Sequence, residues 1–272
     1  MPASNGEATE VFACVIGEKT VPTARMYHLS NDATPIVCTY PFWVLRRGDL
    51  VTLVDTGFAR ETAERRGVTY YADPLDRLGA LGIDPEAVGD IVITHAHFDH
   101  LGALDPYRNA IVHIQAAELE YFTGRGAHHP YAEVAERPAL EQLDRLRAEG
   151  RLDELDGAAE IELARLVPVG GHTPGMQVAA VRHRPAPLVL AADASHYFMN
   201  LEHNTPTTLI HAYEPYQSGF DVIRALSAGG NWLPGHDPKM LDLLDPVADG
   251  VYRVPLEWRT PSGASQHPNG AA

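Results

Sequence analysis

The sequence predicts a mixed α/β fold, and three observations lead to this prediction. Short apolar runs such as Ile91-Val92-Ile93 end in polar turn residues, as buried strands do. Other stretches carry leucines at helical spacing, for example Leu140, Leu143 and Leu146 within residues 138–149. The two kinds of segment alternate along a chain of 272 residues, and this alternation indicates helices packed on sheets.

Strands and helices of the first half can be assigned from pattern and turn residues. The expected strands cover residues 11–16, 36–45, 50–54, 91–93 and 110–114. The expected helices cover 60–66, 74–81, a short segment from 85, 115–122 and 138–149. Pro41 predicts a bulge, an edge position or a bend in the second strand, because proline donates no ladder hydrogen bond. Of Tyr40, Phe42 and Trp43, most are expected in the core and one or two beside a pocket.

The second half is expected to continue in the same way. Its strands cover 161–169, 177–182 and 188–192, and a helix covers 215–228. Residues 123–137 contain Gly124, Gly126, His128, His129 and Pro130, and we expect a loop over the functional site with exposed histidines. We therefore divide the chain into a disordered tail at 1–10, a single domain at 11–260 and a flexible tail at 261–272.

Charge and composition exclude several classes of protein. The formal net charge is -15 and the pI is about 5.3, so nucleic acid is not an expected partner. No apolar run approaches the ~20 residues that cross a bilayer, so no membrane partner is expected. The polar start of the chain does not resemble a signal peptide, so we expect a cytoplasmic location. Cys14 and Cys38 are expected to be reduced, on buried strands.

The segment from Thr94 to Gly102 carries the strongest chemical pattern. Three histidines and one aspartate, namely His95, His97, Asp99 and His100, follow an expected strand within six residues. Neutral imidazole and carboxylate are ligands of divalent ions such as zinc. The alternative is a polar loop with incidental histidines. We favour a metal site, because this spacing directly after a strand rarely arises by chance.

The spacing His-x-His-x-Asp-His resembles the signature of the metallo-β-lactamase superfamily, and the chain looks most like its N-acyl-homoserine lactonase branch. The resemblance runs from the first strands to His236 and implies an αββα sandwich, with two mixed β-sheets flanked by helices. It assigns to a first metal His95, His97 and His172, to a second metal Asp99, His100 and His236, and to both metals the bridging Asp193. Taken singly, His172 could be a turn residue, Asp193 a helix cap and His236 a surface residue.

The resemblance implies two divalent metal ions, which can hold one hydroxide between them. Zinc is the expected ion, although manganese, iron and cobalt accept the same ligands. Asp55, in the turn Asp55-Thr56-Gly57, is expected to brace the histidine loop, to cap the following helix, or to do both. His113 alternates with apolar neighbours, and we expect it to be structural.

The chain departs from the lactonase pattern near the bridging aspartate. Homoserine lactonases carry a tyrosine three residues after it, and here that position is His196, with Tyr197 next. His196 could contact the substrate or brace the site, and Tyr197 could replace the missing phenol. The resemblance also implies that Asp99 carries a proton to the leaving group. The candidate catalytic residues are thus Asp99, His196 and Tyr197.

These features predict a dinuclear metal-dependent hydrolase, with a lactone as the expected substrate. The bridging hydroxide would attack the ring carbonyl of an N-acyl-homoserine lactone or of a pathway-specific lactone. The alternatives are hydrolysis of another ester, thioester or cyclic amide, a metal-binding or redox protein without hydrolysis, and a metal-free scaffold. The expected partner is a small-molecule lactone or ester, and a homodimer is left open.

Overall fold

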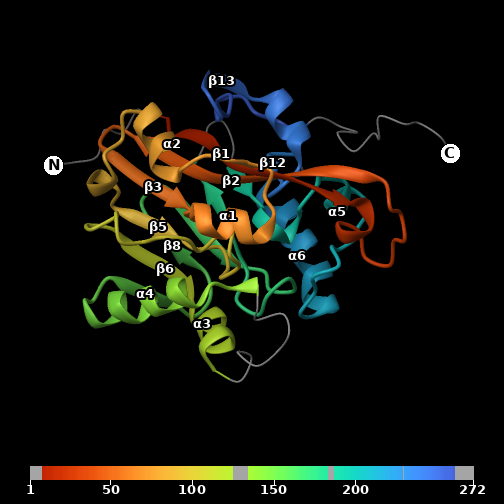
Figure 1. Ribbon diagram of the computed structural model, residues 1–272, viewed down its shortest axis with the longest axis horizontal. Helices are drawn as coiled ribbons and strands as arrows, with labels where there is room; N and C mark the ends of the chain where they lie inside the picture. Colours follow the sequence, from red (N-terminus) through yellow and green to blue (C-terminus); the bar gives the residue numbers. More distant parts are fainter. Residues whose placement is uncertain (1–7, 125–133, 183–186, 229, 261–272) are drawn as a thin grey trace.

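The computed structural model describes residues 8–124, 134–182, 187–228 and 230–260, and its strands form two sheets (Figure 1). The first sheet contains β1 (Glu10–Pro22), β2 (Pro35–Arg47), β3 (Leu50–Val54), β4 (Tyr70–Tyr71), β5 (Asp90–Val92), β6 (Ile111–Gln115), β7 (Leu152–Leu155), β13 (Asp245–Ala248) and β14 (Val251–Arg253). The second contains β8 (Ala159–Glu160), β9 (Ala164–Pro168), β10 (Gln177–Val181), β11 (Leu188–Leu190) and β12 (Trp232–Leu233).

Both sheets are mixed. The strand order in the first is β13-β14-β1-β2-β3-β5-β6-β7, with β4 paired to β1. The neighbouring strands β3, β5, β6 and β7 are parallel to one another. The order in the second is β12-β11-β10-β9-β8, where only the β11–β12 pair is parallel among the described strands. Parallel neighbours bring their carboxyl ends to the same edge of the sheet, and the candidate functional residues follow strands at such an edge.

Helices connect and cover the sheets. They are α1 (Arg60–Arg66), α2 (Pro74–Ala80), α3 (Ala116–Thr123), α4 (Arg137–Ala148), α5 (Phe198–Glu202) and α6 (Tyr213–Leu226), with 3-10 turns at Thr23–Arg25, Pro85–Ala87, Ala192–Ala194 and Pro238–Leu243. The expected start of α2 is confirmed, since the Asp73 side chain accepts a hydrogen bond from the Leu75 amide and Pro74 opens the helix. Figure 1 shows α3 and α4 beside β6.

Alternation along the strands of the first sheet divides the core into two clusters. Phe12, Cys14 and Ile16 of β1 pack in one cluster with residues of α1 to α4. Val11 and Ala13 point to the other face and pack with the second sheet and with α6. The order of layers is therefore helices, sheet, sheet, helix, which confirms the predicted αββα sandwich.

The irregularity expected at Pro41 is confirmed as a bulge, and the bulge lies on the neighbouring strand. Val15 pairs with Pro41 and Gly17 with Tyr40, so Ile16 is the extra residue of β1. An edge position for Pro41 is wrong, because β2 lies between β1 and β3. The bulge leaves the ladder locally unpaired, which lets a central strand accept a proline.

The predicted second-half elements are largely confirmed, with two corrections. The expected strand 161–169 is shorter in the structure, because only β9, at Ala164–Pro168, forms within it. The expected strand 188–192 ends at Leu190, because the chain turns at Ala192, whose φ is 42°. Both cysteines are buried and free, as expected.

The expected tails and the expected loop at 123–137 are only partly covered. Residues 1–7 and 261–272, and with them most of both tails, lie outside the described residues. The same is true of residues 125–133, which include His128, His129 and Pro130. The boundaries of a single domain at 11–260 stay our proposal. Among the described helices, none combines the length and the apolar character that crossing a bilayer would require.

Candidate metal centre

The candidate ligands come from loops that leave strand ends. The Thr94–Gly102 segment follows β5, and His172 lies in the loop between β9 and β10. Leu190 of β11 pairs in parallel with Leu233 of β12. Asp193 and His236 each lie three residues beyond these partners, so the parallel register delivers them to the same edge.

The seven candidate ligands gather into two groups around a shared carboxylate. We call His95, His97 and His172 the first half-site, and Asp99, His100 and His236 the second half-site. In each of them one ligand atom per residue lies within 4.8 Å of the others, and Asp193 completes the first group. All seven residues are buried, so none of them is a surface residue.

Asp193 stands between the two half-sites. Its Oδ2 lies 3.5 Å from Nε2 of His95 and 3.1 Å from Nε2 of His172. Its Oδ1 lies 3.1 Å from Nε2 of His100 and 2.8 Å from Nε2 of His236. One carboxylate thus presents a different oxygen to each half-site. An imidazole has no such pair of neighbouring donor atoms on one side of the ring.

The donor atoms fit divalent metal ions. The buried Nε2 atoms of His95 and His100 lie near Asp193 but have no hydrogen bond among the described residues. Leaving buried polar atoms unpaired is costly, and a metal ion in each half-site would give each of these nitrogen atoms a partner. Imidazole and carboxylate are also the donor types that zinc and related divalent ions accept.

The two half-sites differ in protonation. Burial, and then the positive charge of neighbouring histidines, hold the pKa values of His95 and His97 well below the ordinary value. Burial also opposes protonation of His100 and His236, but nearby acidic groups, Asp193 foremost, outweigh it. The pKa of each is raised well above the ordinary value. Without metal, His95 and His97 are therefore neutral, whereas His100 and His236 are protonated.

A buried glutamate holds the loops of the first half-site through their backbone. Glu118, at the start of α3, is fully buried and accepts hydrogen bonds from the amides of Ala96, at 2.8 Å, and Gly175, at 2.9 Å. A side chain at Gly175 would collide with the backbone of Glu118, so this approach requires glycine. The ring of His172 is oriented by its Nδ1, which lies 2.8 Å from the Leu209 carbonyl oxygen.

A buried aspartate holds the second half-site through a histidine ring. Asp55 lies 2.7 Å from Nδ1 of His100 and accepts from the amide and the hydroxyl of Thr94, at 2.8 and 2.9 Å. Asp55 therefore braces the loop, whereas α1 begins after Ala59 without a side-chain cap. Nδ1 of His236 lies 2.7 Å from the Thr39 carbonyl oxygen. Both contacts leave Nε2 directed at the cluster.

His196 lies at the cluster, and Tyr197 does not. Nε2 of His196 is 3.1 Å from Oδ2 of Asp193, and its buried Nδ1 has no partner among the described residues. Burial lowers the pKa of His196 to about 4, so its ring is neutral at pH 7. The hydroxyl of Tyr197 instead donates to the Val37 carbonyl, 2.6 Å away, and lines a different pocket.

A cavity of about 200 Å³ opens onto the cluster, and its lining includes both expected and unexpected residues. Cys38 and Tyr40 of β2 line it, and the Tyr40 ring centroid lies 5.5 Å from that of His236. Tyr40 is thus the aromatic residue that borders a pocket, as expected for one or two of them. The mouth carries Lys19 and Arg25, for which the sequence contained no local pattern.

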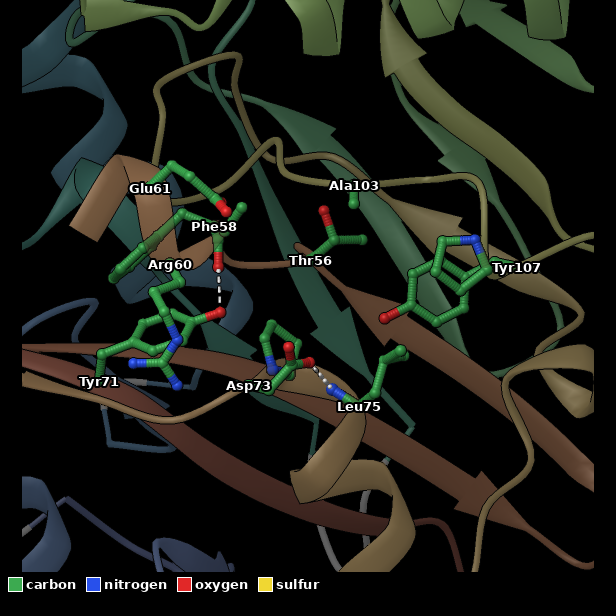
Figure 2. Close-up of a pocket in the computed structure, with 12 residues that line it drawn as sticks. Thr56, Phe58, Arg60, Glu61, Tyr71, Asp73, Leu75, Ala103 and Tyr107 are labelled. Carbon is green, nitrogen blue, oxygen red and sulfur yellow. Dashed lines mark hydrogen bonds between the residues drawn. The ribbon is translucent and has the colours of Figure 1, made fainter. Parts of the chain in front are cut away.

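A second cavity, of about 320 Å³, lies beside α1 and α2 (Figure 2). Its walls include Thr56, Tyr71 and Asp73, and it contains none of the seven candidate ligands. Figure 2 shows two of its polar groups already paired, because Tyr71 donates to the Phe58 carbonyl and Asp73 caps α2. The metal-binding pattern therefore belongs to the first cavity.

His113 lies apart from the cluster, in β6. Its Nε2 is 2.8 Å from Asp90 and its Nδ1 is 2.9 Å from Asp153, on the two neighbouring strands. These contacts agree with the structural role expected for it.

Known proteins resemble this chain over most of its length. The sequence profile of the Metallo-beta-lactamase superfamily matches residues 37–245. The N-acyl homoserine lactonase AttM of Rhizobium johnstonii is 29% identical over 231 residues, covering 73% of this chain and 81% of that protein. An N-acyl homoserine lactonase from a Bacillus species is 28% identical over 205 residues, covering 69% of this chain and 73% of that protein.

Solved structures share the fold. An N-acyl homoserine lactone hydrolase, with the product N-hexanoyl-L-homoserine bound at its catalytic metal center, has a TM-score of 0.73 at 19% identity, covering 88% of this chain and 97% of that chain. AidC, a dizinc quorum-quenching lactonase, has a TM-score of 0.67 at 17% identity, covering 85% and 88%. The profile match and the related sequences show that the chain belongs to the metallo-β-lactamase superfamily and resembles its N-acyl homoserine lactonase branch.

Proposed function

We propose that this metal-dependent hydrolase opens a lactone ring at a centre of two divalent metal ions. The observation that carries the proposal is the position of Asp193, whose two oxygens face the two half-sites. The related sequences support a lactone as the substrate class, since they are named N-acyl homoserine lactonases. Zinc is the ion we propose first, because buried histidines and aspartates suit it.

The chemistry divides between the metal ions and the protein. When bound, a pair of divalent ions supplies a hydroxide nucleophile at neutral pH and stabilises negative charge on oxygen. The half-sites would hold the ions, with Asp193 shared between them. Asp99 lines the cavity, and although burial raises its pKa, nearby His100 and His236 lower it to about 2, so Asp99 is ionised at pH 7. We assign to Asp99 the role of accepting the proton that the nucleophile loses on attack and passing it to the departing alkoxide.

His196 is the group we place against the substrate carbonyl. Its ring lines the cavity, and its Nδ1 is not engaged by the described residues. At pH 7 the ring is neutral, because its pKa is lowered to about 4, and it donates to the carbonyl in the tautomer that carries the proton on Nδ1. Tyr197 is not assigned this role, since its hydroxyl is bonded to the backbone of β2.

The replacement of a phenol by an imidazole favours a lactone other than N-acyl-homoserine lactone. The two groups differ in size and in hydrogen-bond geometry, so the carbonyl and its substituent would sit differently. Another ester, a thioester or a cyclic amide remains the alternative substrate class, and a homodimer stays a prediction.

A substrate panel tests this proposal. Protein loaded with zinc is assayed on N-acyl-homoserine lactones, simple γ- and δ-lactones, open-chain esters, a thioester and a lactam, with metal content measured on the same sample. We expect about two ions per chain and turnover of a lactone above all others. Turnover confined to esters or thioesters, or a protein that holds two ions and hydrolyses nothing, would contradict the proposal.

A further inference from the structure

Positive side chains gather at the mouth of the metal cavity. Lys19, Arg25 and Arg66 line it, although the chain as a whole has 21 Lys and Arg against 36 Asp and Glu. Among the described lining residues, the only carboxylates are Asp99 and Asp193, which we assign to the metal ions. With two divalent ions in place, both the floor and the mouth of the cavity are positive.

The fold already uses two of these three cations. Arg66 forms an ion pair with Glu136 at 3.0 Å and lies over the ring of Phe98, 4.6 Å from its centroid. Lys19 directs its ammonium to the carbonyl of Arg66, at the end of α1, where a positive charge is favourable. Their position at the cavity therefore has a structural explanation as well as a functional one.

Arg25 has no such explanation. Its backbone carbonyl accepts hydrogen bonds from Thr208, which fixes the chain at this point of the mouth. Its exposed guanidinium has no ion pair or hydrogen bond to any other described residue. An arginine presents a planar set of donors that matches a carboxylate. Placed at the mouth of a positive cavity, it is free to receive one.

We propose that the substrate carries an anionic group, a carboxylate, on the part of the molecule that points away from the reacting carbonyl. This inference rests on the proposed function and adds the substrate's charge to it. Arg25 receives the carboxylate and Lys19 adds to the local positive potential. A neutral acyl chain would gain nothing from these charges, whereas an anion is also drawn into the cavity by the field of the whole site.

A pair of lactones that differ only in charge tests the inference. γ-Butyrolactone bearing a carboxylate on the ring carbon next to oxygen is compared with the corresponding carboxamide, using zinc-loaded protein. We expect the wild type to prefer the anion in kcat/KM. Arg25→Gln should reduce that preference about threefold to fivefold, mostly through KM, and Arg25→Glu should reduce it further. The preference should also fall as salt is added.

Arg137→Gln is the matched control, because Arg137 is 90% exposed in its side chain and lies on α4, outside the cavity lining. It should keep the wild-type preference. The inference is overturned if the carboxylate gives no advantage, or if Arg25→Gln and Arg25→Glu behave like Arg137→Gln.

Direct binding separates this inference from the proposed function. Calorimetry on the zinc-loaded protein compares glutarate with glutaramate, in which one carboxylate is replaced by an amide. We expect glutarate to bind more tightly, and Arg25→Gln to remove most of the difference. If no lactone of either charge is opened but this difference persists, the proposed reaction is wrong and the anion site stands. If lactones are opened and the two compounds bind equally, the anion site is wrong.

Discussion

The two half-sites of the metal centre are held by different kinds of contact. In the first, Glu118 bonds to the backbone of the Ala96 and Gly175 loops and touches no ligand ring. In the second, Asp55 contacts the ring of His100 directly. The first half-site therefore depends on the shape of its loops, and the second depends also on a charge. We infer from this difference that ions bound in the two half-sites would be controlled separately, and the following variants test this.

Asp193→Ala should have the largest effect, because Asp193 belongs to both half-sites. We expect both ions to be lost or strongly weakened together and turnover to become undetectable. Elemental analysis beside kinetics measures both. Asp221→Ala is the control, since Asp221 has a side chain that is 82% exposed and lies on α6. A variant that keeps two ions and full activity would show that the bridge is elsewhere.

His196→Ala tests the group that contacts Asp193 but belongs to neither half-site. We expect turnover to fall about 10²–10³-fold while two ions remain bound, as when one donor to a developing oxyanion is lost. His196→Tyr should be better tolerated, because a phenol can also donate. Loss of an ion from His196→Ala would make His196 a ligand or a support of one, and normal turnover would make it a structural residue.

Asp55→Asn should affect the second half-site selectively. The amide cannot support His100 as the carboxylate does, so we expect affinity for one ion to fall about 10- to 100-fold while the other is retained. Asparagine is suited to the position because Asp55 has a φ of 66°, which Asn accepts well. Competition with a chelator measures the two affinities. Equal weakening of both would contradict separate control.

Acidification should remove the second ion before the first. The pKa values of His100 and His236 are raised in the metal-free protein, so binding there displaces protons, while His95 and His97 are already neutral. The affinity of the second half-site should therefore fall as pH falls, about tenfold per pH unit for each proton displaced. Metal content after dialysis at stepwise lower pH should pass through one ion per chain. A direct drop from two to none would refute this order.

Glu118→Gln should have the smallest effect on the metal ions. Glutamine retains an acceptor oxygen for one loop amide, so we expect a fall in thermal stability of the metal-free protein and nearly unchanged relative affinities for the two ions. Thermal unfolding followed by circular dichroism, with and without zinc, measures this. Selective loss of one ion would show that Glu118 supports a ligand ring and not only the backbone of the loops.

Local features of the site could be predicted from sequence, and contacts between distant segments could not. The residues from His95 to His100 are close in sequence, so one strand and one loop bring them together. Asp55 was expected as a brace from the family resemblance, and its place at the end of a strand also allowed a helix cap. Glu118 was missed, since its role depends on Gly175, and a glutamate in the first turn of a helix is ordinary.

The same limit applies at other positions. The direction in which the Tyr197 side chain points depends on backbone angles in a turn, and these cannot be inferred from the spacing between Asp193 and Tyr197. The strand expected at 161–169 is limited to Ala164–Pro168, the residues that pair with β10. The fold class was predicted correctly because strand alternation and helical periodicity are local, whereas the layering came from the family resemblance.

The contact between His236 and the Thr39 carbonyl has a consequence for how the protein is made. The two residues are 197 positions apart, and β12 must pair with β11 before His236 can reach the cluster. A growing chain thus exposes His95, His97, Asp99 and His100 long before the remaining ligands have been synthesised. Contacts of such high sequence separation form late in folding. The complete centre can therefore be filled only after the two sheets dock, and metal ions bound there would act as a clamp that holds the amino- and carboxy-terminal halves together.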